Sequence, residues 1–317
     1  MKKGNVLIFG GIIVDSYMAV ENYPIRGQDV FMHDSFDRVG GCAINVAQTL
    51  KNMGMDPYVV SAIGGDTRGN MIMKYLKDEK FHTDCIKQLE EEDTGYCATI
   101  LEDGGERTFL TYKGCESFFS TKMIPDDLMK NASYAYITGY YLLDERYSED
   151  ILKNIDKLKA EGSRVLFDPG PLAHHIKKET LLSVISKADI ITPNESEADN
   201  IKNLLSLNIE PEDWSGEMNI ELVVLKSGSR GVKVWNHDMG FYMPPYKVEA
   251  IDTTGAGDSF AAGLIYGLWK GLTTYEAVRF ASACGAIATT FKGPHGKFGV
   301  EDVMKLIRTN REEIYDR

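Results

Sequence analysis

The segment from Asp252 to Leu264 combines residue types that could move a proton beside a bound anion. Its apolar residues recur at helical spacing after a small-residue turn, which predicts that the turn opens a buried helix. The amides of Gly255-Ala256-Gly257 would lie at the start of that helix, where unpaired N–H groups and the helix dipole favour an anion. Asp258 in the same turn could remove a proton from a hydroxyl while the amides bind an arriving phosphoryl group. The alternative is a capping aspartate in an ordinary glycine-rich turn.

Two better-known glycine motifs do not fit the chain. No Gly-x-x-x-x-Gly-Lys-Ser/Thr sequence occurs, which excludes a Walker-type nucleotide site. Phe260 stands where a dinucleotide-binding motif would carry its last glycine or alanine, and the run does not open a βαβ unit. A dinucleotide-binding function is therefore weakly supported.

A second segment, Gly40 to Gly64, places an amide side chain at the start of another helix. Apolar residues between Ala43 and Met53 fall on one helical face, and Gly54 stands where that helix would end. Asn45 would lie in the first turn beside paired glycines, where its amide could both donate to and accept from a polyhydroxylated ligand. The alternative is that Asn45 only supports the start of the helix.

These two segments resemble the two signature motifs of the ribokinase-like, or PfkB-type, carbohydrate kinase family. The match covers Gly40 to Gly64 and Asp252 to Ile265 without a mismatch, and the similarity extends over nearly the whole chain. The resemblance implies an ATP-dependent sugar kinase that transfers the γ-phosphoryl group to a hydroxyl of a small carbohydrate. It also implies magnesium as the metal that accompanies ATP.

The resemblance assigns roles to residues in both motifs and in three further segments. The catalytic residues would be a general base, Asp258, and an anion hole formed by Gly255, Ala256 and Gly257. The residues that bind the acceptor would be Asp15, Gly41, Asn45 and Asp258. Those that bind ATP would be Asn194, Lys226, Gly228, Gly231 and Gly257. Glu197 would hold Mg²⁺, partly through water, and a monovalent cation such as K⁺ would lie at Asp252 and Thr254.

Several of these assignments have alternatives in the sequence. Asn194 and Glu197 have the spacing of a helix capping box, and one turn can serve both purposes. The loop after Lys226 could be a plain β-turn, and relatives often carry threonine at that position. The loop Lys292 to Gly296 departs from the ribokinase pattern, which leaves potassium dependence open.

The elements that must position these residues alternate between strand and helix. Strands are predicted at 5–13, 57–63, 134–138, 164–168, 188–191 and 221–226, and helices at 43–53, 68–79, 147–160, 196–205, 258–269 and 275–290. This alternation predicts a three-layer α/β/α fold with a mostly parallel sheet. Residues 94–113 form a hairpin pattern, whereas 15–38 are irregular with short alternating runs.

The resemblance assigns those two irregular segments to a small β-sheet lid over the sugar. We expect a lid of residues 15–38 and 93–115 on an α/β core of residues 1–14, 39–92 and 116–317. Because the edges of such a sheet are unpaired, a homodimer through the lids is expected.

Composition agrees with a globular enzyme. The 317 residues carry a net charge of −12, which argues against nucleic acid or an acidic membrane surface as the main partner. Five scattered cysteines fit a reducing cytoplasm, and the apolar run at 5–14 is too short to span a membrane. A cytoplasmic location is therefore expected.

The acceptor is the least determined feature. Phosphosugar kinases generally need extra cations in the lid region, and those available are Arg26, Arg38, Arg107 and Lys113. The segment from Phe167 to Pro171 lacks the asparagine and arginine often found there in fructose-type kinases, which favours an unphosphorylated acceptor. A free monosaccharide is the first choice, and a nucleoside stacked on tyrosines such as Tyr112, Tyr140 and Tyr141 is the second. A non-catalytic sugar sensor on the same scaffold is the alternative from another class.

Overall fold

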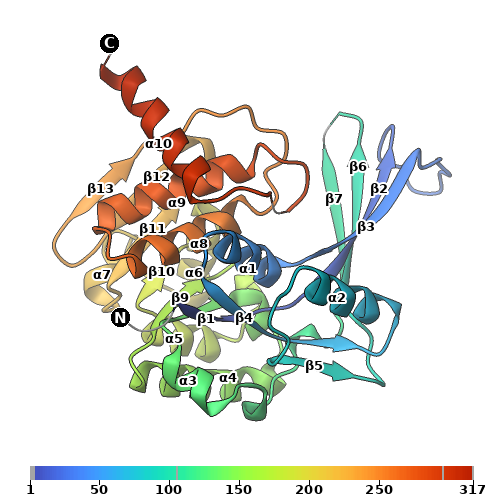
Figure 1. Ribbon diagram of the computed structural model, residues 1–317, viewed down its shortest axis with the longest axis horizontal. Coiled ribbons are helices and arrows are strands. Elements are labelled where there is room, and N and C mark those ends of the chain that lie inside the picture. The colour runs from blue at the N-terminus through green and yellow to red at the C-terminus, as the bar shows by residue number, and fades with distance from the viewer. Residues whose placement is uncertain (1–3, 105, 295, 316–317) are drawn as a thin grey trace.

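A nine-stranded sheet forms the centre of the computed structural model, which describes residues 4–104, 106–294 and 296–315 (Figure 1). Its strands are β1 (Asn5–Phe9), β4 (Asp56–Gly64), β5 (Ile86–Leu89), β8 (Tyr134–Thr138), β9 (Arg164–Asp168), β10 (Ile190–Ile191), β11 (Leu222–Lys226), β12 (Val232–Trp235) and β13 (Gly240–Met243). They lie in the order β13-β12-β11-β10-β9-β8-β1-β4-β5. All neighbours from β11 to β5 are parallel, and β12 and β13 extend the sheet in antiparallel pairing.

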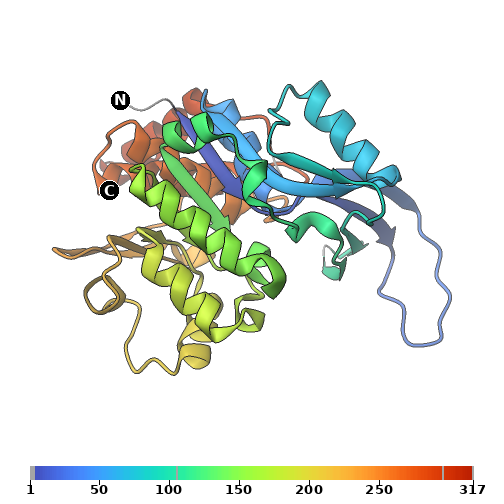
Figure 2. The ribbon, with the colours of Figure 1, turned by 90° about the horizontal axis from the view of Figure 1, so that it is seen from below.

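Helices cover both faces of this sheet (Figures 1 and 2). One face is covered by α1 (Cys42–Asn52), α2 (Thr67–Asp78), α8 (Ala256–Trp269), α9 (Thr274–Ala288) and α10 (Val300–Tyr315). The other is covered by α3 (Asp126–Asn131), α4 (Glu145–Ala160), α5 (Lys178–Lys187), α6 (Glu195–Leu205) and α7 (Trp214–Glu217). Alternate residues of β1 enter the two cores, Val6 and Ile8 on one side and Leu7 and Phe9 on the other. The predicted three-layer α/β/α fold is confirmed.

Polar residues lie at the carboxyl ends of several neighbouring parallel strands. Asp168 and Lys226 are the last residues of β9 and β11, and Asn194 follows β10 and forms a parallel bridge with Lys226. The carboxyl ends of parallel strands are where α/β sheets bind their ligands. The apolar strands therefore bring three polar side chains together although the chain separates them.

A second sheet of four strands projects from the core, on the right in Figure 1. Its strands are β2 (Ile13–Val20), β3 (Asp34–Gly40), β6 (Tyr96–Glu102) and β7 (Arg107–Tyr112), in the order β3-β2-β6-β7. The central pair β2 and β6 is parallel, and both outer pairs are antiparallel. We call these four strands and their connecting loops the lid.

The two faces of the lid carry different residues. One row of directly paired residues runs Asp15, Arg38, Cys97 and Thr111, and the next runs Ser16, Asp37, Ala98 and Leu110. Successive rows point to opposite faces of the sheet. Because Arg38 donates to the carbonyl of Lys292 in the core, the first row faces the core and the second faces away.

The local predictions were wrong in several places. The first strand ends at Phe9 rather than residue 13, because the chain leaves the core there and Ile13 already begins the lid. The segment 15–38 contains two regular strands, which the sequence hides because one face of the lid is polar. Strand β10 is only two residues long, since the chain turns at once into the Asn194 loop. In the part of the chain that the structure describes, no helix is both long and apolar enough to cross a bilayer.

Candidate active site

Asp258 lies in the first turn of α8, as the sequence predicted. The turn before it is tight: Gly255 is the N-cap with φ 76°, a left-handed conformation that glycine tolerates. A side chain at Gly255 would also collide with the carbonyl of Pro294. The Ala256 amide donates to the Thr253 carbonyl at 3.3 Å, a long bond that must give way if this amide binds a phosphoryl oxygen.

Asn45 of α1 holds the carboxylate of Asp258. Its Nδ2 donates to Oδ2 of Asp258 at 2.7 Å, joining the two sequence motifs. Its Oδ1 is buried and has no hydrogen-bond partner among the described residues. A buried polar atom without a partner is costly, so this oxygen is suited to accept a hydrogen bond from a ligand hydroxyl. The paired glycines let α1 start here, since Gly41 has φ 95° and a Cβ would lie 2.6 Å from the carbonyl oxygen of Gly11.

Two carboxyl groups face this ligand position with raised pKa values. Burial, and then the charge of Asp258, raises the pKa of Asp15 on β2 to about 7. Burial raises the pKa of Asp258 to about 6, although hydrogen bonds from Asn45 and the Cys42 thiol oppose that rise. A carboxylate with a pKa near 6 is a stronger base than an exposed aspartate and is still mostly ionised at neutral pH. Asp258 therefore has the properties of a general base.

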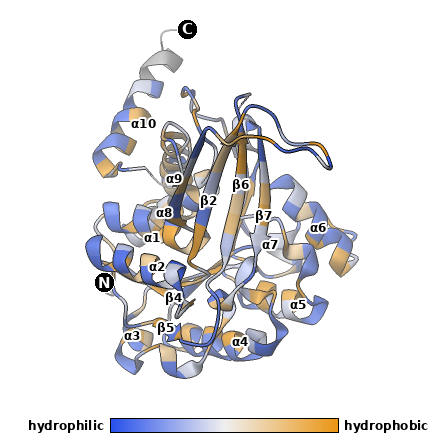
Figure 3. Ribbon diagram, turned by 90° about the vertical axis from the view of Figure 1, so that its right-hand side faces the viewer, coloured by the Kyte–Doolittle hydropathy of each residue, from blue (hydrophilic) through white to orange (hydrophobic). Residues whose placement is uncertain are grey.

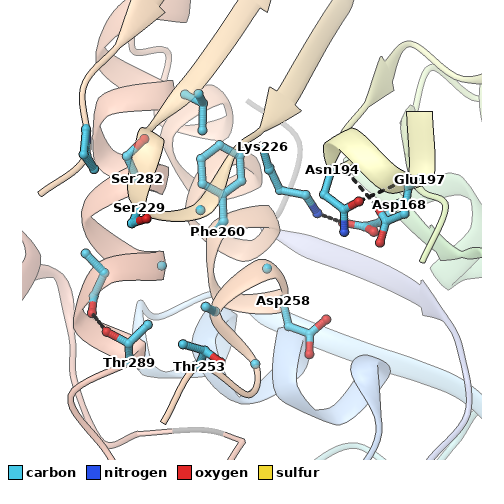
Figure 4. Close-up of a pocket in the computed structure, with 18 of the residues that line it drawn as sticks. Asp168, Asn194, Glu197, Lys226, Ser229, Thr253, Asp258, Phe260, Ser282 and Thr289 are labelled. Atoms are coloured by element: carbon cyan, nitrogen blue, oxygen red, sulfur yellow. Dashed lines mark hydrogen bonds and ion pairs between the residues drawn. The ribbon is translucent and has the colours of Figure 1, made fainter. Parts of the chain in front are cut away.

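A second charged group lies on the other side of Asp258 (Figure 4). Lys226 Nζ donates to Oδ2 of Asp168 at 2.8 Å, and Thr192 donates to the same oxygen at 2.9 Å. A Cβ placed on Gly257 would be 3.5 Å from Lys226 Nζ, so the ammonium lies close to the predicted anion hole. Lys226 thus points into the site rather than along an exposed loop.

The Asn194 turn serves as the predicted capping box. Asn194 Oδ1 accepts from the Glu197 amide at 2.8 Å, and Glu197 Oε2 accepts from the Asn194 amide at 2.8 Å. Glu197 is only 4% exposed, and burial raises the pKa of its carboxyl while the charge of Lys226 lowers it. Asn194 and Glu197 therefore cap α6, and the same turn places both side chains on the wall of a cavity.

These residues line a cavity of about 550 Å³. Its polar end contains Asp168, Asn194, Glu197, Lys226 and Asp258. Its other end is a mostly apolar slot formed by Val232, Pro245, Tyr246, Val248, Ala250 and Ala286. Gly228 (φ 56°) and Gly231 (φ 82°), which belong to one turn, also line the cavity. An apolar slot that leads to a polar end containing Lys226 fits the base and the phosphates of a nucleoside triphosphate.

The structure brings most predicted residues to one place, with two exceptions. Asp15, Asn45 and Asp258 form the acceptor side, and the ATP candidates form the other. Asp252 and Thr254 are not among the residues that line this cavity. They come just before Gly255 in the chain and accept hydrogen bonds from Arg107 of the lid. Of the three tyrosines proposed to stack on a nucleoside base, Tyr140 lines the cavity, Tyr141 is buried, and Tyr112 pairs with Tyr96 in the lid.

Sequence reasoning missed Asp168, Cys42 and the apolar slot, and it listed Arg107 only as a lid cation available to a phosphosugar. Asp168 had a usable signal, since it ends an apolar strand at the edge where ligands bind. The others had none, because their positions depend on contacts between distant parts of the chain.

A model of the pfkB family of carbohydrate kinases matches residues 3–297. The chain belongs to the pfkB family of carbohydrate kinases. This pfkB-family protein is thus an enzyme, an ATP-dependent phosphotransferase.

Individual relatives of this pfkB-family kinase differ in their acceptors. It is 26% identical to fructokinase-1 of Zea mays over 320 residues, which cover 95% of this chain and 97% of the relative. The solved structure of a Xylella fastidiosa fructokinase with bound ATP superposes with a TM-score of 0.85 at 21% identity, covering 98% of this chain and 99% of that one. A nucleoside kinase of Methanocaldococcus jannaschii superposes with a TM-score of 0.81 at 22% identity, covering 97% and 99%. These likenesses establish the fold and leave the acceptor to the site itself.

Proposed function

We propose that this kinase transfers the γ-phosphoryl group of ATP to a hydroxyl of a free monosaccharide, with Asp258 as the general base. The observation that carries the proposal is the position of Asp258. It lies between an acceptor side, where Asn45 offers an unpaired oxygen, and an ATP side, where Lys226 approaches Gly257.

In the proposed mechanism, the acceptor hydroxyl lies between Asp15, Asn45 and Asp258. Asp258 takes the hydroxyl proton as the oxygen attacks the γ-phosphorus in line with the leaving ADP. The amides at the start of α8 stabilise charge on the transferred group, and Lys226 adds a positive charge beside it. Closure of the lid over the acceptor would exclude water and limit hydrolysis of ATP.

Magnesium fits the carboxylate donors at the ATP end. Within the described residues, no group of three or more His, Cys, Asp or Glu could enclose a metal, which suits an ion that keeps most of its water. Glu197, Asp168 and Asn194 would hold Mg²⁺ mainly through water, and the ion would neutralise charge on the phosphates.

An unphosphorylated acceptor is supported by the partners of the lid cations. Arg107 bonds to Asp252, Arg38 bonds to the Lys292 carbonyl, and Lys113 lies 3.6 Å from Glu116. Arg26 is exposed in the loop 21–33. Since three of the four candidate cations already have partners in the chain, little charge is left for a phosphate on the sugar.

A nucleoside is the second candidate because the core-facing side of the lid carries aromatic rings. Tyr17 and Phe36 stack with centroids 4.8 Å apart, two residues along their strands from Asp15 and Arg38. Rings at this position could cover a nucleoside base or the apolar face of a sugar.

We also propose that the lid, predicted as residues 15–38 and 93–115, closes on the core as a unit and joins two subunits through its outer face. That face contains Met18, Ala98, Ile100 and Leu110. Figure 3 shows the lid strands β2, β6 and β7 side by side, with hydrophobic stretches among them. Leu110 is 54% exposed, so burial against a second copy would remove apolar surface from water. ATP as a substrate and five free cysteines support a cytoplasmic location.

The test is ADP release with magnesium and ATP against a panel of free sugars, phosphosugars, sugar acids and nucleosides. We expect a free sugar to be phosphorylated and Asp258→Asn to lose about 100- to 10,000-fold in kcat, the range for a general base. Asp238→Asn, at the exposed tip between β12 and β13, is the matched control and should remain active. Full activity of Asp258→Asn would overturn the mechanism. Silence of the wild-type enzyme with sugar binding retained would favour a sensor.

A further inference from the structure

Two arginines of the lid reach across to the loops on either side of the anion-hole turn, one that precedes α8 and one that follows α9. Arg107 Nη1, on β7, donates to Oδ1 of Asp252 at 2.7 Å and to Oγ1 of Thr254 at 3.0 Å. Arg38 Nη1, on β3, donates to the carbonyl of Lys292 at 2.9 Å. The Arg107 side chain is 19% exposed and that of Asp252 is 5% exposed, so this ion pair is largely shielded from water.

Asp252 connects both loops to the start of α8. Its Oδ1 also accepts from the Thr254 amide at 2.8 Å, and its Oδ2 accepts from the Gly293 amide at 2.9 Å. Burial alone would raise the pKa of Asp252, but hydrogen bonds from Thr254 and Gly293 and the charge of Arg107 lower it below its ordinary value. The carboxylate is therefore ionised throughout the working range of pH, and its position fixes residues 252–254.

These contacts do not fit a bound monovalent cation. Such an ion would need several of the nearby oxygens, which include the Asp252 carboxylate, the Thr254 hydroxyl and the Lys292 carbonyl. Each of these oxygens accepts a hydrogen bond from a guanidinium of the lid. A guanidinium also supplies the same single positive charge, and its planar donors can bond two acceptors at once.

We propose that Arg107 takes the place of a monovalent cation in this enzyme, so that the lid itself, with the help of Arg38, positions the anion-hole turn. The kinase is then independent of potassium, and formation of the anion hole depends on the lid being closed. Arg107 is a positioning residue, because it acts on the turn through Asp252 and Thr254. The inference rests on the proposed kinase function and extends it.

The first experiment compares turnover in the chlorides of potassium, sodium and tetramethylammonium at equal ionic strength. We expect the wild-type enzyme to show the same kcat in all three. Arg107→Met should lose about 10- to 100-fold in kcat with a smaller change in the KM for the acceptor, and potassium should restore part of the loss. The kcat of Arg107→Lys should fall between those of the wild-type enzyme and Arg107→Met, because lysine keeps the positive charge. The control Arg26→Met, an exposed lid arginine, should behave as wild type.

A second readout does not depend on activity. Thermal unfolding of Arg107→Met should shift to higher temperature in potassium chloride relative to tetramethylammonium chloride, whereas the wild-type protein should not shift. A potassium requirement in the wild-type enzyme would overturn the inference. So would an Arg107→Met enzyme with normal kcat, or one that loses kcat but gains neither activity nor stability from potassium. If no acceptor is phosphorylated by the wild-type enzyme, the proposed function fails, while the unfolding comparison still tests the replacement of the cation.

Discussion

At the scale of single residues, the site is built from carboxyl groups in environments that oppose their ionisation. On the acceptor side, burial raises the pKa of both Asp15 and Asp258, and the charge of Asp258 raises that of Asp15 further. Hydrogen bonds from Asn45 and Cys42 and the charge of Lys226 oppose the rise at Asp258. On the ATP side, Lys226 compensates Asp168 and Glu197. An acceptor whose hydroxyls donate to Asp15 and Asp258 should therefore stabilise the folded protein when it binds, in addition to serving as the substrate.

Asp15→Asn should change stability with a clear pH dependence. Because the folded-state pKa of Asp15, about 7, lies above its ordinary value of 3.8, the folded protein holds a proton that the unfolded chain releases. The resulting loss of stability is absent below the ordinary value, grows as pH rises and is complete above the folded-state pKa. We expect the variant to be more stable than wild type by about 1–3 kcal/mol near pH 8 and by less near pH 5. Urea unfolding at both pH values measures this, with exposed Asp29→Asn as the control. An equal effect at both pH values would contradict the assignment.

The sequence contained most of the site because its two motifs are local. Asn45 and Asp258 each lie in the first turn of a helix whose boundaries follow from nearby glycines and apolar spacing. The Arg107–Asp252 pair joins residues 145 positions apart, and no local pattern marks such a pair. For the same reason the sequence could not indicate that Asp168 holds the Lys226 ammonium, which was predicted to bind ATP.

At the scale of elements, the turn that opens α8 depends on one glycine. Gly255 is left-handed and is also packed against the carbonyl of Pro294, so a side chain there meets two separate obstacles. The neighbouring loop 292–294 is thereby in direct contact with the turn. The sequence predicted the helix and its glycines, but the packing of a distant loop against them could only come from the structure.

Gly255→Ala can be compared with a matched variant. Gly271 has φ 78°, close to that of Gly255, but a Cβ there would meet no atom within 4 Å. Both alanine variants should lose about 1–2 kcal/mol of stability from the left-handed backbone. Gly255→Ala should lose more because the turn must move, and its kcat should fall at least about tenfold. Chemical unfolding and turnover measure the two effects. Equal stability and equal turnover of the two variants would show that the Pro294 contact is unimportant.

The strands of the lid show where local patterns are weak. The central strands are apolar runs with two buried faces and were found readily, whereas β2 and β3 have one face toward a polar site. Their polar residues, such as Asp15 and Arg38, made the segment 15–38 look irregular. The residues that make the strands hard to predict are thus those that face the site.

At the scale of the whole molecule, the lid is the expected contact between subunits. Leu110→Asp would place a charge on the outer face at the edge strand β7, at the end of the row with Asp37, Ser16 and Ala98. We expect the wild-type protein to be a dimer by light scattering and Leu110→Asp to be a folded monomer, since a desolvated charge opposes burial. Met239→Asp, at a similarly exposed position on the core hairpin, should stay dimeric. A monomeric wild-type protein at working concentration would end this proposal.

The alternation of the lid strands also limits how this protein can change in length over evolution. Inserting one residue within β2 or β7 would exchange the two faces, moving Asp15 or Arg107 away from the core and bringing apolar outer residues into the site. Insertions in the loop 21–33 shift no pairing. Length variation among descendants of this chain should therefore accumulate at that loop, while the lengths of the lid strands stay fixed.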